Sequence, residues 1–403
     1  MVPEEWEKHP VGKICRSIVP GRNKPKEFNG SIPWVTTPEI TGRYIPSELQ
    51  QNYVSNEALK ECGGKTVPSG AVVMAAVGEL GLVAITSEVV VLNQQLHAFV
   101  CSDLVFNEYL AYWLSSQKPY METIASKTTI PYLNKTNCES IPVALPPLPE
   151  QRKIAAILST WDKAISTTER LIDNSKQQKK ALMQQLLTGK KRLLDDSGRP
   201  FKGEWEIIKF ESVVVKTQLG TTERTKESKD SNVVPLIKMG NLTWGGFDFN
   251  KLETVPKSIV DESLALQAGD FLFNTRNTPE LVGKSAVWKG QLTEATFDNN
   301  INRITFNHAV NTDFICFYLN HGKGKAIVNS LPAGSTSVAA IYWKDLKNIK
   351  VPIPTIKEQQ KIVSVLTNAA KEIGLLQQQL ADLKQEKKAL MQQLLTGKRR
   401  VMI

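Results

Sequence analysis

One twelve-residue stretch occurs twice in this chain, and that repeat constrains the fold more than any other feature. The sequence KKALMQQLLTGK occupies residues 179–190 and returns at residues 387–398, 208 positions later. The same offset aligns the preceding residues back to Glu150 and Glu358 without an insertion or deletion. Loops tolerate changes of length, so a constant register over about forty residues indicates that the length of each segment itself matters.

Both repeated segments are predicted to be long helices that pair with each other. In the second segment, apolar residues recur at alternating steps of three and four, which is typical of a coiled-coil seam. The first segment has the same register but a more polar middle, so we expect it to need the second as its partner. Lys179 and Lys387 interrupt the seam, and their long stems are expected to carry the charge outward. The apolar seam of the second segment comprises Leu366, Ala369, Ile373, Leu376, Leu380, Leu383, Leu390 and Leu394.

Signals for the ends of both helices are present. Thr355 and Glu358 fit a capping box at the start of the second helix. Gly189 and Gly397 are predicted to close the two helices in a left-handed conformation, which glycine adopts without a steric cost. Three basic residues follow each glycine, where they complement the negative end of the helix dipole.

Two globular regions precede the helices, and each is predicted to be a mixed α/β domain. Short strand-like runs alternate with Gly, Pro and Asn turns and with a few helical stretches. The regions resemble each other only in outline; SGAVVMAA in the first, for example, echoes AGDFLFNT in the second. A proline-rich segment, IPVALPPLPEQ or IKVPIPTIKEQ, then favours an extended connection into each helix. The predicted segments are domains at 1–149 and 193–357 and helices at 150–192 and 358–403.

The composition argues against several classes of protein. No apolar run reaches the ~18 residues that a transmembrane helix needs, and the N-terminus MVPEEWEKHP does not read as a signal peptide. Five cysteines are scattered and never form a C-x-x-C pair, which favours a reducing cytoplasm over a disulfide framework or a zinc site. The four histidines show no metal-ligand spacing. We therefore expect a cytoplasmic protein with no membrane segment and no metal site.

The charge of the chain predicts an anionic partner. The net charge is +10, and nucleic acid is the usual partner of a basic chain. The two helical segments carry +6 and +4, whereas the two domain segments carry −2 and +2. Any DNA-binding face of a domain is therefore expected to be a local patch.

The order of these segments resembles a known family. PPLPEQRKIAAIL followed by ALMQQLLTGK, and the second copy with VPIPTIKEQQKIVSVL, resemble the specificity subunit of type I restriction–modification enzymes. The resemblance covers essentially the whole chain, although Ile and Thr replace some prolines in the second copy.

The resemblance implies an architecture and a division of labour. The fold would be α/β, with two mixed α/β target-recognition domains separated by two long helices that form an antiparallel coiled coil with a pseudo-twofold internal repeat. Each domain would read one half of a bipartite, asymmetric site in double-stranded DNA. Two adenine-N6 methyltransferase subunits would dock on the chain, and restriction and translocase subunits would join them. S-adenosylmethionine, ATP and Mg would belong to those partners, and this chain would bind no cofactor.

The residues themselves favour a non-catalytic role. Adenine methylation needs a pocket such as N-P-P-Y for the flipped base, and PPLPE lacks the Asn and the aromatic residue. CGGKT at 62–66 resembles the end of a P-loop, but Leu59 occupies the position of its first glycine. Two alternatives stay open: a self-sufficient restriction–methylation enzyme, and a coiled-coil protein-binding scaffold without DNA specificity.

Base reading requires polar side chains that loops or helix starts bring to base edges. The loops at 126–135 and 332–337 stand at near-equivalent positions before the two proline-rich segments, which favours both; the alternative is that they are ordinary solvated loops. The candidate DNA-binding residues are Arg22, Lys24, Lys26, Arg43, Tyr44, Lys127, Thr128, Thr129, Tyr132, Lys135, Arg224, Lys226, Arg276, Asn277, Lys284, Ser335 and Thr336.

Residues outside the seam are also identical in the two copies of the repeat. A coiled coil needs only its seam, so this further identity indicates two related docking sites for two copies of one partner. The candidate docking residues are Gln184, Gln185, Thr188, Gln392, Gln393 and Thr396.

The helix length is predicted to act as a ruler. Forty helical residues span roughly 60 Å, which sets an upper bound of about 18 base pairs between domain centres. Inserting four residues into either helix is expected to lengthen the unread gap and leave the half-sites unchanged.

Overall fold

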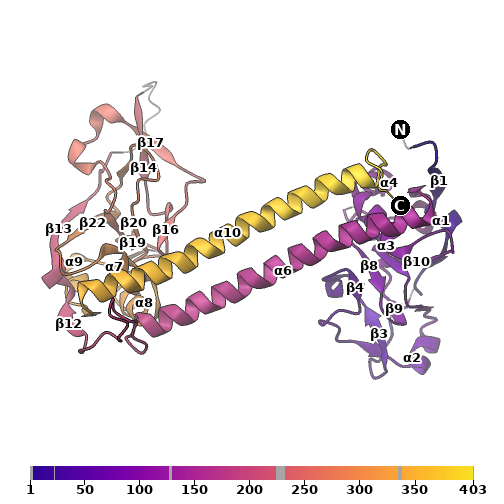
Figure 1. The fold of residues 1–403 in the computed structure, drawn as a ribbon, viewed down its shortest axis with the longest axis horizontal. Coiled ribbons are helices and arrows are strands. Elements are labelled where there is room, and N and C mark those ends of the chain that lie inside the picture. Colours follow the sequence, from indigo (N-terminus) through magenta and orange to yellow (C-terminus); the bar gives the residue numbers. More distant parts are fainter. Residues whose placement is uncertain (1–2, 22, 127–128, 224–231, 335–337, 403) are drawn as a thin grey trace. The chain divides into compact units, whose positions relative to one another are not determined.

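The computed structural model describes residues 3–21, 23–126, 129–223, 232–334 and 338–402. The chain divides into two compact units, and each unit holds one globular domain together with parts of both long helices (Figure 1). The first unit comprises Met1–Arg170 with Gln378–Ile403, and the second comprises Leu171–Gln377.

The first domain contains two main sheets and the two-stranded sheet β1-β11. The larger has the strand order β2-β10-β7-β8-β4, and the smaller has the order β5-β3-β9-β6. Helix α3 packs against β7 and β8, which are almost entirely buried because their residues are apolar on both faces. The strands are β1 (Glu7–Pro10), β2 (Cys15–Ile18), β3 (Ile32–Val35), β4 (Tyr44–Ile45), β5 (Tyr53–Val54), β6 (Thr66–Val67), β7 (Val72–Ala75), β8 (Val83–Thr86), β9 (Val90–Leu92), β10 (Leu96–Cys101) and β11 (Pro142–Leu145). The helices are α1 (Val11–Ile14), η1 (Thr37–Glu39), α2 (Asn56–Glu61), α3 (Asn107–Ser116), α4 (Lys118–Ile124) and α5 (Lys135–Glu139).

The second domain is built in the same way. Its larger sheet has the order β13-β22-β18-β20 and its smaller sheet the order β17-β14-β21. The strands are β12 (Glu206–Lys209), β13 (Val214–Leu219), β14 (Val233–Ile237), β15 (Leu242–Thr243), β16 (Gly246–Phe247), β17 (Glu253–Pro256), β18 (Phe271–Asn274), β19 (Arg276–Asn277), β20 (Ser285–Val287), β21 (Thr296–Phe297), β22 (Ile301–Phe306), β23 (Ala333–Gly334), β24 (Ala339–Ala340) and β25 (Lys350–Ile353). The helices are η2 (Phe210–Val213), η3 (Lys257–Ile259), η4 (Glu262–Leu264), α7 (Thr312–Asn320), α8 (Gly322–Asn329) and α9 (Trp343–Leu346).

Strand pairing shows that the two domains share the central part of one topology, to which the first domain adds β4 and β6. In the larger sheets, β10 pairs antiparallel with β2 and β7, as β22 pairs with β13 and β18. In the smaller sheets, β3 runs parallel to β9 and antiparallel to β5, as β14 runs with β21 and β17. The outline similarity of SGAVVMAA and AGDFLFNT corresponds to β7 and β18, which occupy the same place in the two sheets.

Each domain closes on itself before the chain enters a long helix. The first strand pairs antiparallel with the last, β1 with β11 and β12 with β25, so part of each proline-rich segment is a strand. Helix α6 then spans Leu148–Leu186 and helix α10 spans Ile356–Leu394.

The two long helices pair antiparallel. In the first unit, Lys384 near the end of α10 lies 2.7 Å from Glu169 in α6, and Lys387 forms an ion pair with Asp162. Every predicted seam residue of α10 is buried or half-buried, whereas most of the neighbouring polar residues are exposed. The prediction of a paired coiled coil is therefore confirmed.

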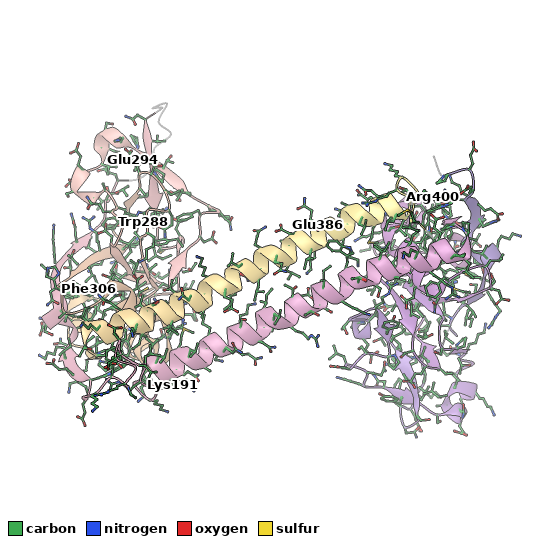
Figure 2. The ribbon with its side chains drawn as sticks, in the orientation of Figure 1. Lys191, Trp288, Glu294, Phe306, Glu386 and Arg400 are labelled. Carbon is green, nitrogen blue, oxygen red and sulfur yellow. The ribbon has the colours of Figure 1, made fainter. Side chains whose placement is uncertain are left out.

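A buried ion pair ties the start of each helix to the residues that follow the other helix. Glu358 is 1% exposed and accepts hydrogen bonds of 2.6 and 2.7 Å from the Arg192 guanidinium. Glu150 is 0% exposed and accepts bonds of 2.7 and 2.9 Å from Arg400. Arg400 is labelled in Figure 2. Both partners are shifted by the repeat offset, so the two pairs are one contact made twice. We call these two ion pairs the helix clasps.

Of the two predictions about the helix ends, the capping box is wrong and the left-handed glycines are confirmed. Glu358 bonds to Arg192, and among the described residues no hydrogen bond joins it to Thr355, so the predicted capping box is not formed. Gly189 and Gly397 have φ of 69° and 71°, the left-handed conformation that was predicted. A Cβ added at Gly189 would lie 3.3 Å from the Trp205 ring, so packing as well as φ favours glycine there.

The glutamine beside each clasp carboxylate holds the domain loop in front of it. Gln151 and Gln359 are both 0% exposed. The Gln151 Oε1 accepts from the backbone N–H of Phe106 at 2.8 Å, and the Gln359 Oε1 accepts from that of Asn311 at 2.7 Å. The Glu-Gln pair at both helix starts is therefore explained by one residue that binds an arginine and one that anchors a loop.

His97 gives the first domain a dependence on pH. Its ring is 3% exposed, lies 2.5 Å from the Ser17 hydroxyl, and burial lowers its pKa to about 4. The unfolded chain therefore binds a proton that the folded domain refuses, so stability falls as the pH drops below about 6.5. Between pH 7 and pH 5 we expect this histidine to remove about 2 kcal/mol.

Denaturant unfolding at the two pH values measures this loss. The matched variant His97→Gln keeps a polar side chain but cannot titrate. Between pH 7 and pH 5 its free energy of unfolding should therefore fall by about 2 kcal/mol less than that of the parent chain. Equal losses in the parent chain and the variant would contradict the prediction.

Candidate nucleic-acid interface and partner-docking surfaces

The repeated twelve-residue stretch ends each helix inside the core of a domain. Leu186 and Leu187 are buried in the core of the second domain, and Leu394 and Leu395 are buried in the core of the first. The repeated leucines are therefore required by packing against the domains as well as by the coiled-coil seam.

The repeated threonines have a local role. The Thr188 hydroxyl donates to the carbonyl of Gln184 at 2.6 Å, and the Thr396 hydroxyl donates to that of Gln392. Both bonds lie within one helix turn, so they account for the threonine identity without a partner. This removes the reason for assigning Thr188 and Thr396 to docking.

The repeated glutamines stay as docking candidates. Gln184, Gln185, Gln392 and Gln393 are all exposed. Within the described parts of the chain, none of their side chains forms a hydrogen bond. Packing, capping and the clasps therefore leave their identity unexplained.

The two seam lysines differ in their surroundings. Lys387 pairs with Asp162, whose other carboxylate oxygen accepts the Tyr112 hydroxyl at 2.5 Å. At the repeat position of Asp162, the second unit has Ala370. Lys179 is half-buried, and burial lowers its pKa. The prediction that the lysine stem carries its charge outward is therefore wrong for Lys387, because Asp162 neutralises that charge beside the seam.

A polar cleft of about 620 Å³ opens in the second domain beside β13, β19 and β22. Arg276 and Tyr342 are exposed on its walls, and among its described lining residues none carries a carboxylate. Such a site favours a polar or anionic ligand. Its lining includes Thr217, Leu219, Arg276, Asn299, Asn300 and Tyr342.

Backbone hydrogen bonds define the same location in the first domain. The N–H of Thr275 donates to Asn300 O at 2.8 Å, as that of Ala76 donates to Gln95 O at 2.7 Å. Arg276 then faces Ala340 in the next strand, as Val77 faces Tyr132. The described parts of the two predicted loops therefore lie at the same edge: Tyr132 pairs with Val77 in the first domain, and Ala333 pairs with Ala340 in the second.

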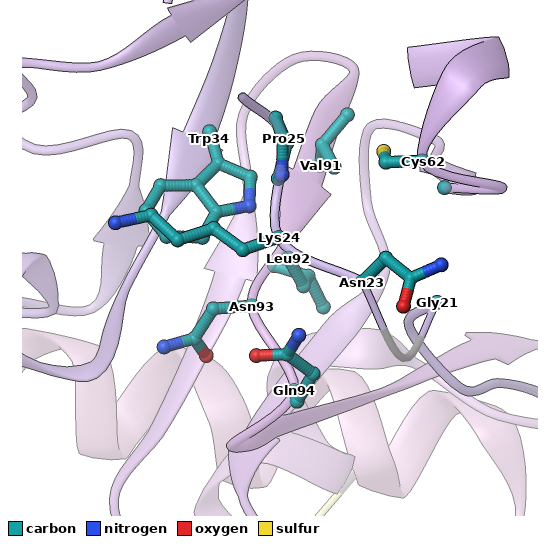
Figure 3. Close-up of a pocket in the computed structure, with 11 residues that line it drawn as sticks. Gly21, Asn23, Lys24, Pro25, Trp34, Cys62, Val91, Leu92, Asn93 and Gln94 are labelled. Atoms are coloured by element: carbon teal, nitrogen blue, oxygen red, sulfur yellow. The ribbon is translucent and has the colours of Figure 1, made fainter. Parts of the chain in front are cut away.

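The amide residues at this edge were not predicted from the sequence. The triplet Asn93-Gln94-Gln95 precedes β10, and Asp298-Asn299-Asn300 precedes β22. In the first domain, Asn93 and Gln94 line a narrow pocket with Asn23 and with Lys24, a predicted DNA-binding residue (Figure 3). A polar triplet at the same place in both repeats is the signal that could have identified them.

Two predicted residues of the first domain are bound to another side chain. Arg43 donates to the Glu108 carboxylate at 2.6 Å and stacks 3.4 Å from the centroid of the Tyr112 ring. The Tyr44 hydroxyl donates to the same carboxylate at 2.6 Å, a bond that raises the pKa of Tyr44. Both side chains therefore have partners within the domain. A role of Arg43 and Tyr44 in DNA binding stays a prediction.

Two predicted residues of the second domain are also engaged. Lys284 is 7% exposed and donates to Met239 O at 3.1 Å; burial lowers its pKa. The Asn277 side chain donates to Asn274 Oδ1 and accepts from the N–H of Thr278. Lys284 is thus removed from the candidates by burial, and Asn277 shapes its own loop.

The remaining predicted residues fall into two groups. Lys135 lies 3.6 Å from Glu139, and Lys24 lies over the rings of Phe28 and Trp34. Besides Tyr44, the candidates with exposed side chains are Lys24, Lys26, Thr129, Tyr132, Lys135 and Arg276. The candidates outside the described residues are Arg22, Lys127, Thr128, Arg224, Lys226, Ser335 and Thr336.

The chain is similar to proteins of one family. The family model for the type I restriction modification DNA specificity domain matches residues 3–175 and 202–385. The chain is 26% identical to the type I restriction enzyme MjaVIII specificity subunit of Methanocaldococcus jannaschii, over 99% of this chain and 94% of that protein. It is 23% identical to the EcoKI specificity subunit of Escherichia coli, over 64% of this chain and 58% of that protein.

Solved structures show the same fold. The type I restriction–modification S subunit from M. genitalium superposes with a TM-score of 0.58 at 14% identity, over 98% of this chain and 96% of that one. A chain from a structure of the type I R-M system gives a TM-score of 0.59 at 18% identity, over 98% of both chains.

The chain belongs to the type I restriction–modification DNA specificity family, because the family model matches both of its halves. It is a specificity subunit, the non-catalytic component that recognises the DNA target. This membership excludes both a self-sufficient enzyme and a scaffold without DNA specificity. Within the described residues, no helix is long and apolar enough to cross a membrane. The cytoplasmic location stays a prediction.

Proposed function

We propose that this subunit reads a bipartite, asymmetric site in double-stranded DNA, one half with each domain. The supporting observation is that two domains of one topology carry different side chains at the same edge. Arg276 and Ala340 in the second domain stand where the first has Val77 and Tyr132. Different side chains on one scaffold read different base edges, so the two half-sites differ.

The same proposal assigns two adenine-N6 methyltransferase subunits to the repeated helix ends. The exposed glutamine pairs occur once at the end of each helix, so one partner surface can bind at both places. Restriction and translocase subunits would join through the methyltransferases. S-adenosylmethionine, ATP and Mg would be bound by those partners and not by this chain.

Co-purification followed by methylome sequencing tests the function as a whole. The chain, expressed in its host with an affinity tag, should carry a methyltransferase subunit. N6-methyladenine should lie in a two-part motif with a constant gap, and should disappear when the chain is deleted. A methylome that survives the deletion would contradict the proposal.

Replacing Gln184 and Gln185 together with alanine should remove one methyltransferase copy and leave the coiled coil intact. Both side chains are exposed, so the change alters a surface and not the seam. Native mass spectrometry should show two partner copies on the parent chain and one on the variant.

Gln177 and Gln178 provide the matched control. They form an exposed glutamine pair in the same helix but lie outside the repeated twelve residues. Their replacement with alanine should leave two partner copies bound. Equal loss in both variants, or loss in neither, would contradict docking at Gln184 and Gln185.

A further inference from the structure

The cleft of the second domain contains a cationic group at a strand position where the first domain has an apolar residue. Arg276 lies at the start of β19, is exposed, and forms no ion pair or side-chain hydrogen bond with any described residue. The first domain has Val77 at this position. An unpaired guanidinium facing a polar cleft is poised for a ligand that offers two adjacent acceptors.

The backbone around Arg276 is held rigidly. Asn274 is 0% exposed, and its amide donates to Arg276 O at 3.0 Å and to Asn300 O at 3.2 Å. This one buried side chain therefore joins both walls of the cleft. In the first domain Ala75 occupies the position of Asn274. The first domain therefore lacks both the arginine and the asparagine that holds its backbone.

The opposite wall of the cleft carries asparagine side chains, which offer neutral donors and acceptors. Asn300 donates its amide to Asp298 Oδ2 at 3.1 Å, which orients its carbonyl oxygen away from that carboxylate. Asp298 itself is 1% exposed, so its negative charge is withdrawn from the surface of the cleft. Arginine therefore supplies the only full charge among the described residues that line this cleft.

We propose that Arg276 reads a guanine in the half-site of the second domain, and that the first domain makes no such contact at the equivalent position. Guanine presents O6 and N7 side by side in the major groove, and a guanidinium binds both acceptors at once. A phosphate would also attract Arg276. The hydrogen-bonded backbone of Arg276 and the asparagine side chains of the opposite wall favour a base edge instead, because a base edge presents its acceptors in a fixed geometry. This inference rests on the proposed DNA function and assigns one specificity residue to it.

Methylome sequencing of Arg276→Val in the native host tests the inference. Valine reproduces the side chain of the first domain. Discrimination for one G·C pair in one half-site should fall about 5- to 150-fold, the range expected for a bidentate base contact. The other half-site and the gap should stay as they are in the parent strain.

Two further variants keep the test decisive. Arg276→Gln replaces the guanine-reading fork with an amide, which pairs with adenine, so the same position should relax or shift towards adenine. Lys216→Ala removes an exposed cation from β13, one residue before Thr217 of the cleft and therefore on the opposite face of that strand. It should leave every base preference unchanged.

The outcomes separate the inference from the function on which it rests. A parent strain without a two-part motif would overturn the proposed function. A two-part motif that is the same in the parent, Arg276→Val and Arg276→Gln strains would overturn only the role of Arg276. Uniformly weaker methylation of an unchanged motif would assign Arg276 to a phosphate and would also overturn the guanine contact.

Discussion

Replacing Arg192 with alanine should lower the free energy of unfolding of the second unit by about 3–5 kcal/mol. Glu358 is 1% exposed, so removing Arg192 leaves a carboxylate buried without its cationic partner. A second loss follows, because Arg192 also donates to Gly203 O at 2.7 Å. Urea denaturation followed by tryptophan fluorescence measures the change.

Lys361→Ala is the matched control for this prediction. Lys361 lies 2.8 Å from Asp196 in the same unit, but the two side chains are 38% and 83% exposed. An exposed pair contributes at most about 1 kcal/mol, since water replaces each partner. Equal losses of stability in Lys361→Ala and Arg192→Ala would contradict the prediction, because the buried clasp would then contribute no more than an exposed ion pair.

The double variant Arg192→Ala with Glu358→Gln separates the two causes. The neutral amide avoids an unpaired buried charge, so this variant should recover much of the stability lost in Arg192→Ala. The corresponding Arg400→Ala change should be milder, because Glu150 still accepts the Trp6 indole N–H at 3.1 Å. The indole nitrogen of Trp205 is buried and has no hydrogen-bond partner among the described residues, so Glu358 lacks this second donor.

Lengthening both helices by four residues should widen the unread gap of the DNA site and leave both half-sites unchanged. Four residues add about 6 Å to a helix, which corresponds to at most about two base pairs. Matched insertions after Arg170 in α6 and after Gln377 in α10 preserve the antiparallel pairing, because each helix gains the same length. Methylome sequencing of the variant reads the gap directly.

A loop insertion provides the control. The same four residues placed between Ser197 and Gly198 enter an exposed turn of the linker between α6 and β12. Here the gap should stay constant, because no helix changes length. A gap that is fixed in the helix variant, or that shifts with the loop variant, would contradict the ruler.

Periodicity and the repeat predicted much of the architecture. The seam from Leu366 to Leu394 was readable because a helix packs one face against its partner, and that requirement depends only on spacing. Gly189 and Gly397 were also readable, since positive φ selects glycine. These predictions depend on rules that act within a single helix.

The candidate site could be predicted only in part. The loops at 126–135 and 332–337 are predicted from their position, and their described residues Tyr132 and Ala333 lie at the same edge of the two domains. Arg43 and Lys284 are predicted as polar residues of loops, but each is bound by a group far away in the sequence. The polar triplets before β10 and β22 were not predicted, because each resembles an ordinary turn unless the two repeats are compared.

The sequence by itself determined that two related helices pair, that two domains precede them and that both halves follow one plan. Spacing and glycine placement carry that information along the chain. Only the tertiary structure decided what the polar residues do. Glu150 and Glu358 meet arginines 250 and 166 residues away, and Arg276 is left without a partner among the described residues. Whether a charge is paired depends on which distant groups the fold brings to it, and no local pattern in the chain encodes that.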